Sequence, residues 1–294
     1  NLNVEGKNLA AFISAFADGA SLPDSIARPF TSKATIAGSE TGGTVSDLIV
    51  KLNGTQGTGR ITIKLGDVTD LNMQLAINKF DVDALLAPKI LADKPKNTKT
   101  DQGKEPDESK ALPLPAAARP KPGAIPFSLK SLPKKLNAVL DISVAALTYN
   151  KSVIRQAKIN ATLGEQEITI SQASALLPGS TDVGLQGIVF DGEKTKLPRF
   201  DGSVDLSTNN MRGLLSWVGV DVAAIPQDRL RKLTFGGKVL ADAKAATLQD
   251  ITVQMDGTKL TGAATVAFRA RPSFGIDLAI DRLNLDGYSP KAKA

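Results

Sequence analysis

The sequence predicts a mainly β protein: a long, curled antiparallel sheet of the repeating groove type, with two short helices and a disordered linker. Whether the two ends of the chain share one continuous sheet does not follow from the sequence. Three observations predict this class. A unit recurs at both ends of the chain, aliphatic and polar residues alternate in most of it, and aromatic residues make up only 4% of the composition. Because alternation with a period of two places every second side chain on the same face of a strand, we expect a sheet with one apolar and one polar face.

The repeat aligns residues 44–85 with residues 247–288 at a constant offset of 203 positions, without a gap. The stretch DLIVKLNGTQGTGRITIKL starts at Asp47, and DITVQMDGTKLTGAATVAF starts at Asp250. Asn-Gly and Asp-Gly supply the positive φ angles of tight hairpin turns. At an offset of 202 the match extends upstream, where NVEGKNLAAFISAF faces DLSTNNMRGLLSWV. We therefore expect two copies of one β unit, at residues 1–88 and 199–290.

Each copy is expected to begin with a short strand and a short helix, followed by alternating strands. Asn8 and Asn210 are candidate N-caps of the helices LAAFISAF and MRGLLSWV. In the third long strand of each copy the apolar positions change parity, from Ile77 to Phe80 and from Ile280 to Leu283. A parity change predicts a β-bulge or a tight bend at 78–80 and 281–283.

Two segments lie between the copies. Residues 89–135 contain eleven Lys or Arg against five Asp or Glu, together with half of the 16 prolines. Such a segment has too little apolar surface to offset its ordering entropy, so we expect a disordered linker. This linker contains the whole net charge of +6, which argues against a basic nucleic-acid-binding face on the folded parts. Residues 136–198 are expected to form a further series of strands.

The composition excludes most enzyme chemistry. The chain has no His and no Cys, so it offers no imidazole base, no thiol nucleophile and no zinc site of the Cys/His kind. We expect no catalytic residues, no metal and no cofactor. The remaining enzyme candidates are Ser131 with Lys134 and the carboxylate pairs Asp81 with Asp83 and Asp277 with Asp281, all at positions where solvated side chains are ordinary. The glycine cluster GSETGG lacks the lysine and the helix of a phosphate-binding loop.

The aliphatic strands have few aromatic residues and few helices to cover them. Either two sheets pack on each other, or one sheet leaves an apolar trough that something else fills. Such a trough suits acyl chains, because burial of each methylene stabilises by about 0.8 kcal/mol and needs no directional contact. The predicted lipid-binding residues are Val50, Ile63, Leu75, Ile77, Leu140, Ile142, Ile159, Val253, Val266, Leu278 and Ile280.

The C-terminal third resembles a known signature. The stretch DGTKLTGAATVAFRARPSFGIDLAIDRLNLDGY, preceded by FDGSVDLSTNNMRGLLSWVGVD, is similar to the C-terminal region of the AsmA family of Gram-negative envelope proteins. The stretch AVLDISVAALTYNKSVIRQAKINATLGEQEITISQASALLPG is similar to the strands that precede it in that family. The first copy departs from the pattern, with NGTQGTG in place of DGTKLTG.

This resemblance implies a function. AsmA-like proteins, which are related to TamB-type proteins, are anchored in the inner membrane by an N-terminal helix and extend into the periplasm as a curled sheet. They are implicated in outer-membrane homeostasis and in phospholipid movement between the membranes, and the family offers no catalytic residues to transfer. The chain begins with Asn and contains no signal peptide and no apolar run of about 18 residues, so we expect a periplasmic piece whose anchor lies outside it.

A structural role is the main alternative. Exposed strand edges can add a strand from a partner, so the chain could be a scaffold or protein-interaction module for outer-membrane protein assembly, without lipid transport. Under either interpretation envelope proteins are expected partners and nucleic acid is not.

Overall fold

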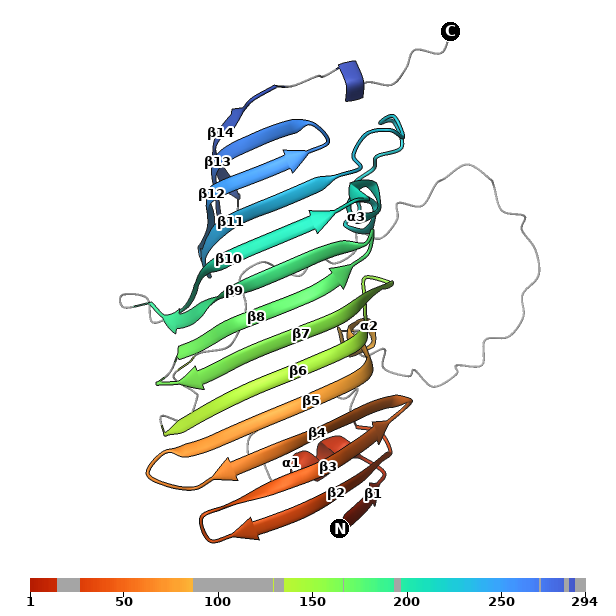
Figure 1. Ribbon diagram of the computed structural model, residues 1–294, viewed down its shortest axis with the longest axis vertical. Coiled ribbons are helices and arrows are strands. Elements are labelled where there is room, and N and C mark those ends of the chain that lie inside the picture. Colours follow the sequence, from red (N-terminus) through yellow and green to blue (C-terminus); the bar gives the residue numbers. More distant parts are fainter. Residues whose placement is uncertain are drawn as a thin grey trace, which may run out of the picture.

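The computed structural model confirms the predicted fold class. It describes residues 1–14, 27–86, 129, 135–165, 167–192, 197–269, 271–282 and 286–288. In these residues a single sheet contains 14 strands, whose spatial order is the same as their order in the sequence (Figure 1). The sheet is not closed into a barrel, because β1 and β14 lie at opposite edges. Both copies of the repeat therefore belong to one continuous sheet.

The first half of the sheet comprises β1 (Leu2–Gly6), β2 (Phe30–Ser39), β3 (Gly42–Leu52), β4 (Thr55–Lys64), β5 (Thr69–Asp81), β6 (Leu136–Tyr149) and β7 (Ser152–Gly164). The second half comprises β8 (Glu167–Leu177), β9 (Thr181–Asp191), β10 (Pro198–Thr208), β11 (Leu233–Asp242), β12 (Ala245–Met255), β13 (Thr258–Ala267) and β14 (Ser273–Ile280). The helices are α1 (Leu9–Ser14), α2 (Val82–Leu86), α3 (Met211–Trp217) and the 3-10 turn η3 (Asp286–Tyr288).

The sheet is mixed, which corrects the prediction of a purely antiparallel one. β5 and β6 pair in parallel, with Leu75 opposite Ile142, whereas all other neighbouring strands are antiparallel. Parallel neighbours cannot be joined by a hairpin and require a long crossover. The predicted linker 89–135 lies in this crossover. It falls outside the described residues except for Leu129, which is fully buried, and Lys135, whose carbonyl accepts a hydrogen bond from the amide of Thr69.

The described residues contain three α-helices, where two were predicted for the chain. The expected N-caps are confirmed: the side chain of Asn8 accepts a hydrogen bond from the Ala11 amide, and that of Asn210 accepts one from the Gly213 amide. The missed helix, α2, has only five residues and follows β5 directly. Asp81 accepts a hydrogen bond from the Ala84 amide, as an N-cap does, and a helix this short leaves no apolar periodicity to detect.

The repeat is reproduced strand by strand. The bounds of β2, β3 and β4 become those of β11, β12 and β13 when 203 is added to each residue number. The irregularities coincide as well: the register between β3 and β4 shifts between Val45 and Leu48, and that between β12 and β13 shifts between Leu248 and Ile251. Asp47 and Asp250 lie in these shifts, each with a φ of 51°. Each copy thus contains the same β-bulge, which the sequence pattern did not reveal.

The predicted irregularity at 78–80 takes a different form. The exposure pattern changes parity there as expected, with Asn78 and Lys79 both exposed before half-buried Phe80. The ladder to β6 nevertheless keeps its register, so no residue is inserted against β6. Instead, the Asn78 side chain accepts a hydrogen bond from the Gln56 amide of β4. In the second copy Asp281 accepts one from the Lys259 amide in the same way, while Leu283 lies outside the described residues.

Glycines at equivalent positions of the two copies permit close contact between strands. A Cβ added to Gly59 would collide with the carbonyl oxygen of Gln74, and one added to Gly262 would collide with that of Asp277. Gly262 also has a φ of 149°, which L-residues rarely adopt. By contrast, a Cβ on Gly257 would meet no atom within 4 Å.

We predict that Gly262→Ala lowers the free energy of unfolding by about 1–3 kcal/mol, because β13 and β14 must separate to admit the methyl group. Gly257→Ala is the matched control and should stay within about 0.5 kcal/mol of the unsubstituted protein. Urea unfolding followed by circular dichroism measures both. Equal stability of the two variants would contradict this explanation of the duplicated glycine.

Candidate functional site

Two uninterrupted rows of apolar residues and glycines cross the sheet from β2 to β14. Each row consists of residues that are opposite one another in successive ladders and therefore project on the same face. The first row is Ile36, Val45, Ile61, Met73, Leu140, Ala161, Ile170, Gly187, Gly202, Val239, Leu248, Ala264 and Ile276. The second row is Gly38, Gly43, Ile63, Leu71, Ala138, Leu163, Ile168, Val189, Phe200, Ala241, Ala246, Val266 and Phe274. We call the face that contains these rows the apolar face.

The ladders place all of the predicted lipid-binding residues on this apolar face. Leu140 belongs to the first row, and Ile63 and Val266 belong to the second. On the same face, Gly57 of β4 is opposite both Val50 of β3 and Ile77 of β5. Ile142 of β6 is likewise opposite both Leu75 of β5 and Ile159 of β7. In the second copy, Leu260 of β13 is opposite both Val253 of β12 and Ile280 of β14, and Gly262 of β13 is opposite Leu278. These residues therefore share the apolar face. The residues predicted from sequence therefore lie on a single surface, although they come from eight of the strands.

Several residues of the apolar face were not on the predicted list. Phe200, Phe235 and Leu248 are examples, and Phe235 is opposite Val253 in the ladder between β11 and β12. The alternation of apolar and polar residues in β10 and β11 could have placed Phe200 and Phe235 on this face. Leu248 is harder to assign from sequence, because the bulge at Asp250 reverses the parity of the residues before it.

The opposite face is polar. Thr44, Thr62 and Asn72 are opposite one another in β3, β4 and β5, and Thr247 and Thr265 repeat this arrangement in β12 and β13. The Thr265 hydroxyl donates a hydrogen bond of 3.2 Å to that of Thr247. Lys238 and Asp250 form an exposed ion pair of 2.8 Å across β11 and β12. The Asp250 hydrogen bond and charge raise the pKa of Lys238. This face is mainly polar, although the same ladder also contains Val139, Ile188 and Leu240.

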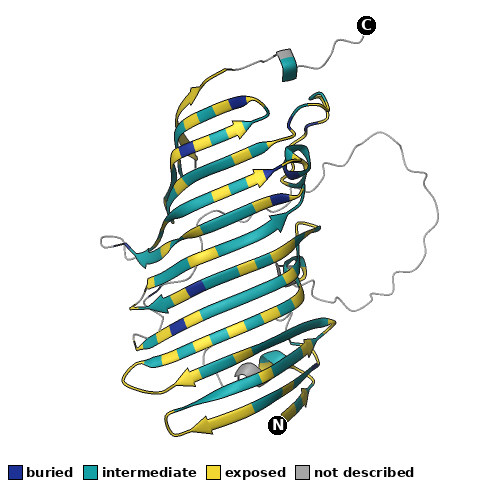
Figure 2. Cartoon of the chain, in the orientation of Figure 1, coloured by how far each residue is buried: buried dark blue, intermediate teal, exposed yellow. Residues whose placement is uncertain are grey.

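No second sheet packs on the apolar face within the described ranges, which argues against the two-sheet alternative. Few described hydrophobic residues are buried, and most of the sheet is half-buried or exposed (Figure 2). The apolar face is the more crowded one: Ala138 and Ala161 on it are only 3% and 6% exposed, whereas Ala76 on the polar face is exposed. Longer side chains such as Met73, Leu140 and Val239 remain half-buried.

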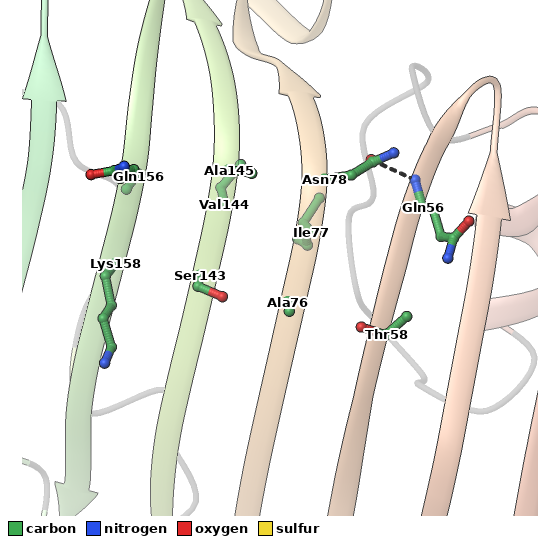
Figure 3. A pocket seen from close by; sticks show the side chains of 11 residues that line it. Gln56, Thr58, Ala76, Ile77, Asn78, Ser143, Val144, Ala145, Gln156 and Lys158 are labelled. Atoms are coloured by element: carbon green, nitrogen blue, oxygen red, sulfur yellow. Dashed lines mark hydrogen bonds between the residues drawn. The ribbon is translucent and has the colours of Figure 1, made fainter.

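The sheet also has shallow hollows, which are lined mainly from the polar face. One of about 480 Å³ lies over β4 to β7, between Thr58, Ala76, Ser143 and Lys158 (Figure 3). Its wall includes Gln156, whose φ of 52° marks a bulge in β7. Of the predicted lipid-binding residues only Ile77 lines this hollow. Most of its lining therefore comes from residues outside the predicted set.

Three of the four carboxylates considered as enzyme candidates, Asp81, Asp83 and Asp281, accept hydrogen bonds from backbone amides. Asp83 accepts hydrogen bonds of 2.8 Å from the amides of Asn150 and Lys151, which ties α2 to the hairpin between β6 and β7. Asp281 accepts one from Lys259, and this bond lowers the pKa of the Asp281 carboxyl. Asp277 is on the polar face, opposite Ala263. Ser131 and Lys134 lie outside the described residues. GSETGG is the hairpin turn between β2 and β3, closed by the pair Ser39 and Gly42.

Asp256 organises the loop that precedes β11. Its carboxylate accepts hydrogen bonds from the amides of Leu230, Arg231 and Lys232 and from the Tyr288 hydroxyl. Burial acts to raise the pKa of Asp256, but these four donors together lower it below the usual value. Burial and the Asp256 carboxylate raise the pKa of Tyr288. Ionised Asp256 is thus favoured in the folded state.

We predict that Asp256→Asn destabilises the fold by about 1 kcal/mol at pH 7, a low value for charged hydrogen bonds because the carboxylate is partly exposed. A carboxyl whose pKa is lowered on folding stabilises above its unfolded pKa and loses that contribution as the pH falls through its folded pKa. The difference from the unsubstituted protein should therefore shrink below about pH 4. Urea midpoints measured between pH 7 and pH 2.5 test this, and a difference that does not change with pH would contradict it.

The described residues contain no group of acidic side chains arranged to hold a metal ion. None of the helices in the described ranges has the length and hydropathy needed to cross a membrane. No family model, curated protein or solved structure matches the chain.

Proposed function

We propose that this chain is a non-enzymatic envelope protein whose apolar face binds or conducts phospholipid between the inner and outer membranes, and so supports outer-membrane homeostasis. The observation that supports this most is the pair of apolar rows that cross the sheet from β2 to β14 without a charged residue. The resemblance of the C-terminal third to the AsmA family supports the same function. In this proposal the protein is periplasmic and an N-terminal segment preceding these residues anchors it to the inner membrane.

The dimensions of the apolar face suit acyl chains. At a strand spacing of about 4.8 Å, the twelve intervals between β2 and β14 span about 58 Å. The hydrocarbon of one bilayer leaflet is about 15 Å thick, so the rows are several times longer than one lipid tail. A tail can therefore stay in contact with aliphatic side chains while it moves from strand to strand.

The chemistry of the face favours movement over fixed binding. Methyl and methylene groups attract an acyl chain at about 25 cal/mol per Å² of buried apolar surface, without directional bonds. Because similar residues recur at every strand, one position binds a tail about as well as the next. The polar side chains of the opposite face keep the same strands hydrated. A continuous path of similar aliphatic contacts is the arrangement that conduction needs.

Photo-crosslinking tests the proposal directly. Photoreactive residues placed at Val253 and Leu278, on the apolar face, should label phospholipid in the intact chain. Their chain neighbours Thr252 and Ala279, on the polar face of the same strands, are matched controls and should not label phospholipid. Absence of lipid from all four variants, together with no phospholipid in a solvent extract of the purified protein, would refute the proposal.

An acidic substitution provides the second test. We predict that Leu278→Asp lowers the yield of lipid labelling by a photoreactive residue at Val253. The reason is that an unpaired charge on the apolar face disfavours contact with acyl chains. Leu278 is already 40% exposed, so the substitution should leave the fold intact. Ala279→Asp adds the same charge to the polar face and should have no effect. Equal loss of labelling in both variants, with circular dichroism unchanged, would contradict a path on one face.

A further inference from the structure

The outer edge of β14 differs from the equivalent edge in the first copy of the repeat. β14 corresponds to β5 at the offset of 203, and both pair on their inner side with an equivalent strand, β13 or β4. On its other side β5 pairs with β6. In the part of the chain that the structure describes, β14 pairs with β13 alone.

The side chains of β14 are more exposed than the equivalent side chains of β5. Leu71, Met73, Leu75 and Ile77 of β5 are half-buried. Their counterparts Phe274, Ile276, Leu278 and Ile280 of β14 are 72%, 70%, 40% and 47% exposed. Because the neighbours on the inner side are equivalent, the missing strand on the outer side accounts for the difference. Four large apolar side chains thus form an exposed stripe beside an unpaired strand edge.

The edge of β14 also lacks the usual protection against strand addition. Natural edge strands are kept short or contain lysine, proline or a bulge. β1, at the other edge of the sheet, has only five residues and contains Glu5. β14 has eight residues, SFGIDLAI, with no lysine and no proline, and its ladder to β13 has no register shift. Its one charged residue, Asp277, is on the polar face and not in the apolar stripe.

We propose that the outer edge of β14 binds an extended segment of a partner polypeptide, added as a parallel strand with alternating aliphatic and polar residues. The model for this partner is β6, the strand that occupies the equivalent edge in the first copy. Applied to β14, the register of β5 and β6 places the residues equivalent to Ala138, Leu140, Ile142 and Val144 opposite Phe274, Ile276, Leu278 and Ile280, respectively. The partner's aliphatic residues would then extend the apolar face by one strand. This inference does not depend on lipid binding.

A peptide with the β6 sequence LNAVLDISVAALTY, with lysines appended for solubility, is the probe. Since the chain contains no cysteine, single cysteines report orientation without background. A parallel strand should crosslink Phe274→Cys of the full chain to a peptide cysteine at the Ala138 position, and Ile280→Cys to one at the Val144 position. We expect these matched pairs to form at least about tenfold faster than the crossed pairs, 274 with 144 and 280 with 138, which corresponds to about 1.4 kcal/mol.

The controls separate the outcomes. A scrambled peptide of the same composition should not crosslink with either variant. Preferential formation of the crossed pairs would mean antiparallel addition and would overturn the proposal, as would equal yields for all pairs. Crosslinking of the chain only to a second copy of itself would also overturn it. The assay contains no lipid, so its result is independent of the photo-crosslinking experiment.

Discussion

The constraint on which the rest of the structure depends is that successive strands must stay in phase. A slip of one residue between two strands would move every aliphatic side chain of one strand to the polar face. Hydrogen-bonded ladders fix this phase from Ile36 of β2 to Ile276 of β14. The bulges at Asp47 and Asp250 are part of the same control, because each realigns its strand where the alternation would otherwise fail.

A single sheet without a covering sheet has few fully buried side chains, so hydrogen bonds and loop contacts stabilise it where packing does not. The carboxylates of Asp256, Asp83 and Asp281 each accept hydrogen bonds from backbone amides that are not used in strand pairing. Glycines at 59 and 262 let neighbouring strands approach. Gly59 and Gly262 are equivalent in the two copies, as are the contacts of Asn78 and Asp281, which indicates that duplication preserved backbone geometry together with the apolar pattern.

Much of the fold could be predicted from sequence, because period-two alternation and duplicated turns are local signals. The same alternation predicted which residues share a face, as Leu75 and Ile142 show by lying opposite each other in the β5–β6 ladder. Sequence could not reveal that this junction is parallel, since pairing partners across a long connection leave no local pattern. Helix α2 was too short to detect, and the bulge at Asp250 hid Leu248 by reversing parity.

The central claim is that lipid contacts one face of the sheet along its length. Single cysteines labelled with a fluorophore at Met73 and Leu248, on the apolar face, and at their chain neighbours Asn72 and Thr247, on the polar face, test it in both copies. Phospholipid with brominated acyl chains quenches fluorophores that its tails contact. The account predicts quenching at Met73 and Leu248 and none at Asn72 and Thr247. Equal quenching on both faces, or none at any position, would contradict it.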